Sequence, residues 1–193
     1  MSYQFIEVTT EDQLEKVYAF RYKIVCEKLG VCELEGCEPN RETDEYDAYS
    51  EHFAAFDEEG EVMACTRLIH HCPIGYPTDN NMQTNIDKLQ FEADKFAELS
   101  RIFIAKELRN RKDTKTLIEG LKVIGYMKMS ALDIEYTYGA LEKPFLRLLN
   151  MYNLPYQPIG EEQHYITPRY PCLLYTNDLE AKNPELVQVW NKT

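Results

Sequence analysis

Acidic residues at short spacing mark two segments of the sequence that could carry acid–base chemistry. Glu42, Asp44 and Asp47 form an E-x-D-x-x-D pattern, and Glu98 opens the run Glu-Leu-Ser-Arg. A carboxylate can accept the proton that an amine must lose before it attacks a carbonyl carbon. The E-x-D-x-x-D cluster lacks the glycine and the glutamate spacing of a calcium-binding loop, so we expect charge pairing or substrate binding there instead.

Three arginines, Arg21, Arg67 and Arg101, lie on predicted elements that should face the interior of the protein. A buried guanidinium needs a partner, and removing one member of a buried ion pair costs about 3–5 kcal/mol. The natural partners are the acidic residues of the two segments above. Two interpretations stay open: these charges hold a polar substrate, or they only brace the acidic loop at 31–50 against the sheet.

A compact basic segment stands out because the chain as a whole is acidic. The formal charge is −12, from 21 basic and 33 acidic residues, which disfavours a nucleic-acid-binding protein. Residues 101–115 nevertheless hold six basic residues against two acidic ones, a local balance of 6 − 2 = +4. Such a patch could dock an anionic partner, and the alternative is an ordinary solvated helix start.

The cysteine and histidine spacing predicts neither disulfides nor a metal site. None of the 6 cysteines forms a C-x-x-C pair, so we expect reduced thiols. His70, His71 and Cys72 lie near Cys65, but this spacing matches no standard zinc pattern. Adjacent residues on a strand also point to opposite faces. We therefore predict no metal and no tightly bound cofactor.

Hydrophobic periodicity predicts strands alternating with helices. A capping box at 10–13 opens the first helix, and the acidic turn at 57–61 joins two strands into a hairpin. The unit at 98–138 requires a parallel strand pair. The sequence therefore predicts an α/β fold, a mixed sheet flanked by helices, in a single domain over residues 1–193. The expected strands are 3–8, 51–56, 62–69, 96–105, 132–138, 156–159 and 164–167, and the expected helices follow residues 10, 112, 141 and 183.

Nothing in the 193 residues predicts a membrane span or an export signal. No stretch approaches the roughly 20 consecutive apolar residues that cross a bilayer. Residues 1–5 show no basic segment leading into an apolar one, so we expect no signal peptide and a cytoplasmic protein.

In this order the motifs resemble those of the acyl-homoserine-lactone (autoinducer) synthases and the related N-acyl amino acid synthases. The resemblance runs from Phe20-Arg21 through the E-x-D-x-x-D pattern and Arg67-Leu68 to the E-x-S-R run at 98–101. The C-terminal motifs look closest to those of the acyltransferases of PEP-CTERM (exosortase) systems. These motifs are L-E-K-P-F-L-R-L-L from Leu141, the P-I-G run at 158–160, His164 and Pro171-Cys172. The resemblance covers roughly residues 15–175.

The resemblance implies the GNAT acyltransferase fold, in which two splayed strands admit the pantetheine arm of an acyl thioester. It implies that Glu98, Ser100 and Arg101 are catalytic, with Glu98 as the base and Arg101 bound to the carboxyl or lactone carbonyl of the acceptor. Backbone N–H groups near Phe103, Ile104 and Ala105 would stabilise the oxyanion. Tyr138 or Tyr152 would return a proton to the departing thiolate. Five residues would form the acceptor pocket or bind the ammonium group of the acceptor: Arg21, Glu42, Asp44, Asp47 and Arg67.

The basic turn at 109–114 bears on the acyl donor. Many members that use coenzyme A hold its pyrophosphate in a glycine-containing turn, and this turn has no glycine. We therefore favour acyl carrier protein over coenzyme A as the donor. The residues expected to bind it are Arg109, Arg111, Lys112 and Lys115.

Three functions follow from the resemblance. The favoured one is an N-acyltransferase that moves a fatty acyl group to the amine of an amino acid or similar small molecule. The second is an acyl-homoserine-lactone synthase with S-adenosylmethionine as the acceptor. Val25 and Leu29 disfavour it, because autoinducer synthases tend to carry aromatic residues there. The third is a non-catalytic module that binds an acyl chain or carrier protein.

Overall fold

The structure, a computed structural model, describes residues 2–29, 37–38 and 40–192. The chain forms two compact units, unit 1 and unit 2. Strands β5 (Val62–His70) and β6 (Phe96–Ile104) and helix α3 (Arg111–Ala131) each contribute to both. The single domain over residues 1–193 stays a prediction. Unit 1 comprises Met1–Arg67 and Arg101–Ile124, and unit 2 comprises Leu68–Ser100 and Gly125–Thr193.

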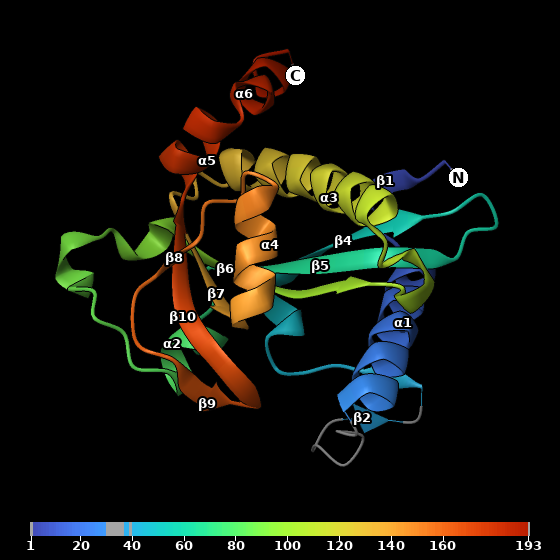
Figure 1. Cartoon of the computed structure of the whole chain (residues 1–193), viewed down its shortest axis with the longest axis horizontal. Helices are drawn as coiled ribbons and strands as arrows, with labels where there is room; N and C mark the ends of the chain where they lie inside the picture. The colour runs from blue at the N-terminus through green and yellow to red at the C-terminus, as the bar shows by residue number, and fades with distance from the viewer. Residues whose placement is uncertain (1, 30–36, 39, 193) are drawn as a thin grey trace. The chain divides into compact units, whose positions relative to one another are not determined.

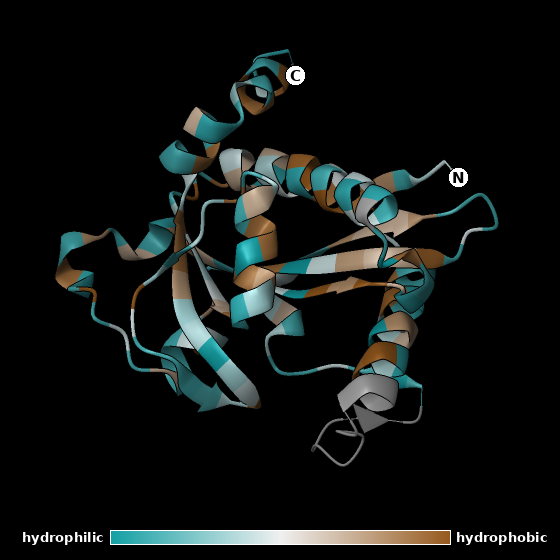
Figure 2. Ribbon diagram, in the orientation of Figure 1, coloured by the Kyte–Doolittle hydropathy of each residue, from teal (hydrophilic) through white to brown (hydrophobic). Residues whose placement is uncertain are grey.

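Unit 1 is built on strands in the order β1, β4, β5 and β6 (Figure 1). Strand β1 (Gln4–Glu7) runs antiparallel to β4 (Ser50–Phe56). The predicted hairpin between β4 and β5 is confirmed, and its hydrophilic turn is teal in Figure 2. The other elements of this unit are α1 (Glu11–Leu29), β2 (Cys37–Glu38), β3 (Arg41–Glu42), two 3₁₀ turns (Asp47–Tyr49 and Lys106–Leu108) and the first part of α3.

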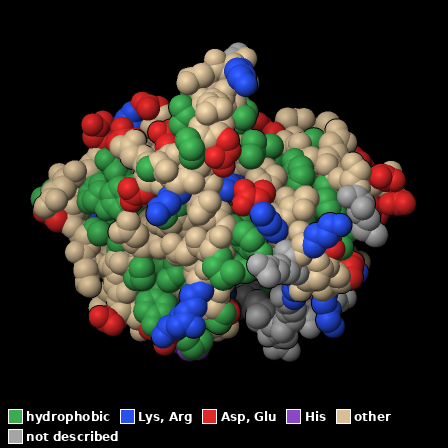
Figure 3. All heavy atoms as spheres, turned by 45° about the horizontal axis from the view of Figure 1, so that its top comes forward, with side chains coloured by type: hydrophobic (Ala, Val, Ile, Leu, Met, Phe, Trp, Pro, Cys, Tyr) green, Lys and Arg blue, Asp and Glu red, His purple; other side chains and the backbone are tan. Residues whose placement is uncertain are grey.

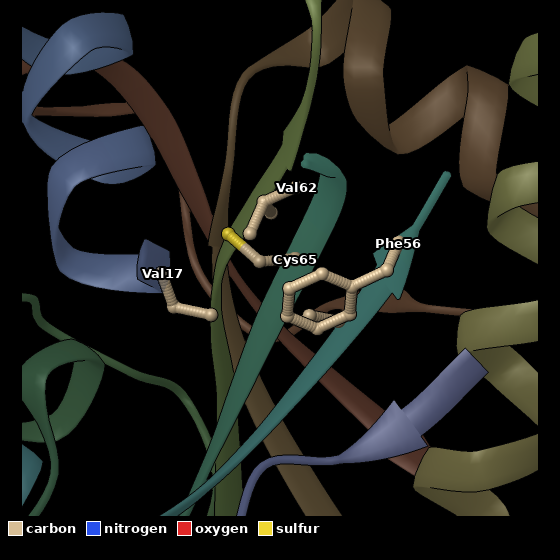
Figure 4. Close-up of a cluster of buried hydrophobic side chains, with 5 residues drawn as sticks. Val17, Phe56, Val62 and Cys65 are labelled. Carbon is tan, nitrogen blue, oxygen red and sulfur yellow. The ribbon is translucent and has the colours of Figure 1, made fainter. Parts of the chain in front are cut away.

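The predicted capping box opens helix α1. The N–H of Gln13 donates to Thr10 Oγ1 at 3.3 Å, and Gln13 Oε1 accepts from the N–H of Thr9 at 3.2 Å. The helix buries Val17 completely, in one cluster with Ala54, Phe56, Val62 and Cys65 of the hairpin (Figure 4). Apolar contact on this face therefore fixes α1 against the strands of unit 1.

Unit 2 is built on strands in the order β6, β7, β10 and β8, with β9 paired to β10. The predicted parallel pair is confirmed, because β6 runs parallel to β7 with Glu98 opposite Tyr138. An aromatic cluster around Phe96 and Tyr138 fills its interior. The strands are β7 (Tyr136–Leu141), β8 (Gln157–Pro158), β9 (Gln163–Tyr165) and β10 (Thr167–Tyr175), and the helices are α2 (Pro77–Asn81), α4 (Lys143–Met151), α5 (Thr176–Lys182) and α6 (Pro184–Trp190), with 3₁₀ turns at Lys88–Gln90 and Ala93–Lys95.

The strand predicted at 132–138 is wrong in its bounds. Strand β7 begins at Tyr136, because the preceding residues close the end of α3. Asp133 adopts a left-handed φ of 56°, and the N–H of Ile134 donates back to the carbonyl of Met129 at 2.9 Å. This is the geometry of a helix C-terminal cap, and it delays the strand by several residues.

Strand β10 was not predicted at its true length. The expected strand at 164–167 is interrupted by a hairpin turn at Ile166: residues 164–165 end β9, and Thr167 begins the nine-residue β10. Pro168 and Pro171 argue against a long strand in the sequence, because proline cannot donate to a ladder. Pro171 nevertheless lies opposite Ala140 of β7, and its carbonyl accepts from the N–H of Ile159 at 2.8 Å.

Among the residues that the structure describes, no helix combines the length and the apolar character needed to cross a bilayer.

Candidate active site

Three arginines and three carboxylates of unit 1 form one continuous charged network. The arginines come from three different elements, α1, β5 and β6. The carboxylates come from β3, the loop after it and the 3₁₀ turn that begins at Asp47. The six formal charges cancel, which allows the group to be buried. We call this group the charged network; its members are Arg21, Glu42, Asp44, Asp47, Arg67 and Arg101.

Asp47 is the most heavily bonded carboxylate of the charged network. Arg21 donates to both its oxygens, at 2.8 and 3.1 Å, and Arg67 donates to Oδ1 at 2.6 Å. The backbone N–H of Asp44 adds a bond of 2.8 Å. Burial alone would raise the pKa of Asp47, but these arginines hold it well below its ordinary value. Asp47 therefore stays ionised as an internal anchor.

The other two carboxylates are also engaged by arginines. Glu42 accepts from Arg21 at 2.5 Å and from Arg101 at 3.0 and 2.6 Å. Asp44 accepts from Arg67 at 2.5 and 3.0 Å and from Arg101 at 3.0 Å. The carboxylates predicted to bind a substrate therefore already receive guanidinium N–H groups, which favours the bracing interpretation for Glu42 and Asp47.

Only one end of the charged network reaches solvent. The side chains of Arg21 and Arg67 are at most 1% exposed, whereas those of Arg101 and Asp44 are 25% and 21% exposed. Arg101 also has a φ of +53°, a left-handed conformation that is uncommon for a side-chain-bearing residue in a strand. Its three bonds to Glu42 and Asp44 hold this backbone in place. Such strain is typical of functional sites.

His52 borders the charged network and was not singled out in the sequence. It is 5% exposed, its Nε2 lies 3.6 Å from Asp47 Oδ1, and its ring meets Tyr18 edge to face. Burial, with Arg21 and Arg67 nearby, lowers the pKa of His52 to about 4. The imidazole is therefore neutral at pH 7.

Glu98 lies in unit 2, three residues before Arg101 on the same strand β6. It is 1% exposed, and its Oε2 accepts a hydrogen bond of 2.8 Å from the backbone N–H of Thr78. Burial and the charges of Cys72 and Glu98 raise the pKa of Tyr76 to about 12, and burial, Asp79 and Glu98 also raise that of Tyr138. The carboxylate therefore lies among phenols that stay protonated at neutral pH.

The residues after Arg101 on β6 belong to unit 1 and are largely occupied with packing. Phe103 packs against the apolar cluster around Val17, and Ile104 is buried. Ser100, the last residue of unit 2 on this strand, is half-buried. The N–H of Ala105, one of the predicted oxyanion donors, donates to the carbonyl of Met63 at 2.9 Å.

The basic residues at 109–115 have two different roles: one anchors the backbone, and others are exposed to solvent. Arg109 donates to the carbonyl of Ile104 through Nε at 3.1 Å and Nη2 at 2.9 Å, so it anchors the end of β6. Lys112 and Lys115 are exposed on α3. The side chain of Arg111 lies outside the described residues. Figure 3 shows one face of the molecule, where basic and acidic side chains are interspersed.

The described thiols and histidines form no metal centre. No group of three or more His, Cys, Asp or Glu within residues 2–29, 37–38 and 40–192 could hold a metal ion. Cys65, Cys72 and Cys172 are free thiols. Burial raises the pKa of Cys65 and of Cys172 to about 12, so neither is poised as a nucleophile.

The structure thus brings six predicted site residues into the charged network and places Glu98 on unit 2 beside Thr78. Sequence reasoning missed Thr78 and His52. No motif marks them, since each owes its position to a fold contact between segments far apart in the chain.

Comparisons with known protein families and proteins show what this chain is similar to. The model of the acetyltransferase (GNAT) domain matches residues 20–119, slightly more than half of the chain. No curated protein sequence matches.

Solved structures of low sequence identity share the fold. The coenzyme-A-dependent acyl-homoserine lactone synthase BjaI superimposes with a TM-score of 0.73 at 15% identity, covering 96% of this chain and 90% of BjaI. The acyl-homoserine lactone synthase LasI gives 0.66 at 17%, covering 94% and 93%. FeeM, an N-acyl amino acid synthase from uncultured soil microbes, gives 0.63 at 13%, covering 97% and 98%. This likeness confirms the expected α/β fold.

Proposed function

Because the chain belongs to the acetyltransferase (GNAT) domain family and is an N-acyltransferase, we propose that it moves a fatty acyl group from a phosphopantetheine thioester to the amine of an amino acid or similar small molecule. The observation that carries this proposal is the buried Glu98 carboxylate, held by the Thr78 N–H at 2.8 Å. A carboxylate fixed in this way can take the proton of an incoming ammonium. The free amine then attacks the thioester carbon.

In the proposed reaction Glu98 takes one proton from the ammonium, the amine nitrogen forms a bond to the acyl carbon, and the carbon–sulfur bond breaks. The departing thiolate receives a proton from a tyrosine hydroxyl, and the second proton that the nitrogen loses on becoming an amide replaces it. Tyr138, whose pKa is raised mainly by burial, keeps its proton at neutral pH and is the candidate donor in preference to Tyr152. Backbone N–H groups of residues 103–104 are the proposed oxyanion donors.

Arg101 is the proposed partner of the acceptor's carboxyl group. Its side chain is the most exposed guanidinium of the charged network, so donor atoms remain accessible at that end. In this proposal the buried members of the charged network hold Arg101 in position and do not touch the acceptor; they are Arg21, Glu42, Asp47 and Arg67. Asp44 and the hydroxyl of Ser100 are the further polar groups proposed at the acceptor.

Acyl carrier protein is the proposed donor partner, with coenzyme A as the alternative. Carrier proteins are acidic, and Lys112 and Lys115 offer exposed positive charge on α3, with Arg111 beside them in sequence. Arg109 contributes by fixing the end of β6. The cytoplasm, where such thioesters are made, is the proposed compartment. BjaI is described as coenzyme-A-dependent, so both donors need to be tested.

The second candidate is acyl-homoserine lactone synthesis from S-adenosylmethionine. The shared fold with BjaI and LasI favours it. The absence of aromatic residues at Val25 and Leu29 disfavours it. A non-catalytic binding module is the third.

One experiment separates these candidates. Purified protein is incubated with acyl carrier protein or coenzyme A thioesters of graded chain length and with the standard amino acids or S-adenosylmethionine, and products are identified by mass spectrometry. An N-acyl amino acid is expected. An acyl lactone with methylthioadenosine would establish the second candidate. Binding of a donor without release of free thiol would establish the non-catalytic module.

A further inference from the structure

One side-chain nitrogen of Arg101, Nη1, makes no hydrogen bond with any residue that the structure describes. Nε and Nη2 donate two bonds to Glu42 Oε1, at 3.0 and 2.6 Å, and one bond to Asp44 Oδ2, at 3.0 Å. Nη1 is also not among the buried polar atoms that lack a partner, so it reaches the solvent-exposed end of the charged network. A guanidinium carries five N–H groups, and the two on Nη1 therefore stay available to a ligand.

The other two guanidinium groups of the charged network are closed to a ligand by burial. The side chains of Arg21 and Arg67 are 1% and 0% exposed, whereas that of Arg101 is 25% exposed. A ligand oxygen that approaches the arginines of this network therefore meets Nη1 of Arg101.

The positive charge of Arg101 is already offset by the two carboxylates that it contacts. Burial alone would raise the pKa of Glu42, but Arg101 and Arg21 hold it below its ordinary value, so this carboxylate keeps its charge. A carboxylate ligand would add a negative charge to a network whose six formal charges cancel. It would also bind through Nη1 alone, because both hydrogens of Nη2 are in use and no fork remains for a bidentate pair. A neutral carbonyl oxygen can accept from Nη1 without adding charge.

We propose that Nη1 of Arg101 recognises the carbonyl oxygen of the acceptor and not a negative charge. The acceptors are then α-amino acids together with their uncharged derivatives: primary amides, esters and lactones. This proposal rests on the proposed function and deepens it, because it names the group beside the amine that the enzyme requires. Amines that carry no carbonyl group are poor acceptors.

The first test compares three acceptors with the wild-type protein: the amino acid that it acylates fastest, the primary amide of that amino acid, and the amine left when the carboxyl group is removed. The kcat/KM of each is calculated for the unprotonated amine. The amide should stay within about fivefold of the acid, and the decarboxylated amine should fall at least about tenfold, as for one lost hydrogen bond to a charged donor. A larger fall for the amide, or a smaller one for the decarboxylated amine, would overturn the proposal.

The second test changes the charge beside Arg101. Asp44→Asn removes one negative charge and keeps an oxygen that can accept from Nη2, so the ratio of kcat/KM for the acid to that for the amide should rise at least about fivefold. Glu15→Gln is the matched control, because it removes the same charge from a surface pair of unit 1, where Arg41 donates to Glu15. Its ratio should equal that of the wild type.

A smaller rise in Asp44→Asn, or an equal rise in Glu15→Gln, would overturn the charge argument and with it the proposal. The ratio compares two acceptors of one protein, so a general loss of activity in a variant cancels. The first test needs no variant and decides the question even where Asp44→Asn does not fold.

Calorimetric titration without an acyl donor separates this proposal from the reaction. The probes are the standard amino acids and their primary amides. An acid and its amide that bind within about fivefold of each other, in a protein that acylates no amine, would support the carbonyl subsite and refute the proposed function. Acylation of acids but not of their amides would refute the carbonyl subsite alone. A protein that acylates no amine, and binds either the acids alone or no probe, would overturn both.

Discussion

Glu98 and Thr78 are joined by a hydrogen bond of 2.8 Å from the Thr78 N–H to Glu98 Oε2, although 20 residues separate them in the chain. The two residues are 1% and 0% exposed. This bond fixes a carboxylate deep inside unit 2. Glu98 is therefore oriented by the backbone before any substrate arrives, which is what a general base requires.

The first prediction concerns this carboxylate. Glu98→Gln keeps an oxygen that can accept from the Thr78 N–H, so the protein should fold, but an amide cannot take the amine proton. We expect turnover, followed as free thiol released, to fall at least tenfold, which is the lower range for loss of a general base. Glu185→Gln, on the exposed face of α6, is the control and should not alter turnover. Turnover of Glu98→Gln at the wild-type rate would remove Glu98 from the mechanism.

The second prediction concerns the charged network. Arg67→Lys replaces a fork that binds Asp44 and Asp47 with a single ammonium, so buried carboxylates lose their donors. We expect a loss of about 3 kcal/mol in the free energy of unfolding, measured by denaturant titration. The matched control is Arg41→Lys. That arginine forms three bonds to Glu15 at the surface, and its loss should cost less than about 1 kcal/mol. Equal losses would show that burial of the network adds nothing.

The third prediction concerns acid stability. The pKa of His52 is about 4 in the folded protein and near 6.5 in the unfolded chain, so the unfolded chain binds the extra proton between these values. The free energy of unfolding should therefore fall by about 3 kcal/mol as the pH drops from 7 to 4. Below pH 4, protonation of Asp47, whose pKa is also depressed, should remove further stability.

His52→Gln tests this assignment, because it removes the titrating ring and keeps a neutral polar side chain. Its denaturation midpoint should depend less on pH between 7 and 4 than that of the wild type. The same slope in both proteins would assign the acid sensitivity to other groups.

The fourth prediction concerns donor docking. Lys112→Glu combined with Lys115→Glu should weaken binding of an acyl carrier protein at low salt, and the difference should shrink as salt rises. The control Lys182→Glu on α5 carries an equal change per site away from the basic turn. Arg109 is left unchanged because it anchors Ile104. Unchanged binding at low salt would refute the docking surface.

The fifth prediction uses two glycines of helix α3. A Cβ on Gly120 would lie 2.2 Å from the ring of Phe5, whereas a Cβ on Gly125 meets no atom within 4 Å. Gly120→Ala should destabilise the protein by about 1–3 kcal/mol through overpacking. Gly125→Ala should stabilise it by about 0.5–1 kcal/mol through helix propensity. Opposite shifts in Tm would confirm the contact between Phe5 and α3, and two stabilising changes would contradict it.

Local patterns in the sequence were enough for much of the fold. The capping box before α1, the hairpin turn between β4 and β5 and the parallel pair of β6 and β7 are all set by residues close in the chain or by simple connection rules. Strand β10 was not predicted at its true length, because Pro168 and Pro171 are unusual residues within a strand. The start of β7 was misplaced, because a helix cap occupies the residues before it.

The candidate site was also predicted only in part from the sequence. The sequence by itself predicted that the arginines on inward-facing elements need carboxylate partners, and it offered Glu42, Asp44, Asp47 and Glu98 as candidates. Only the tertiary structure decided that Glu42, Asp44 and Asp47 accept hydrogen bonds from Arg21, Arg67 and Arg101. It alone also decided that the backbone N–H of Thr78 donates to Glu98. The physical reason is that hydrogen bonds act over about 3 Å, and only the fold brings residues that are distant in the chain within that range.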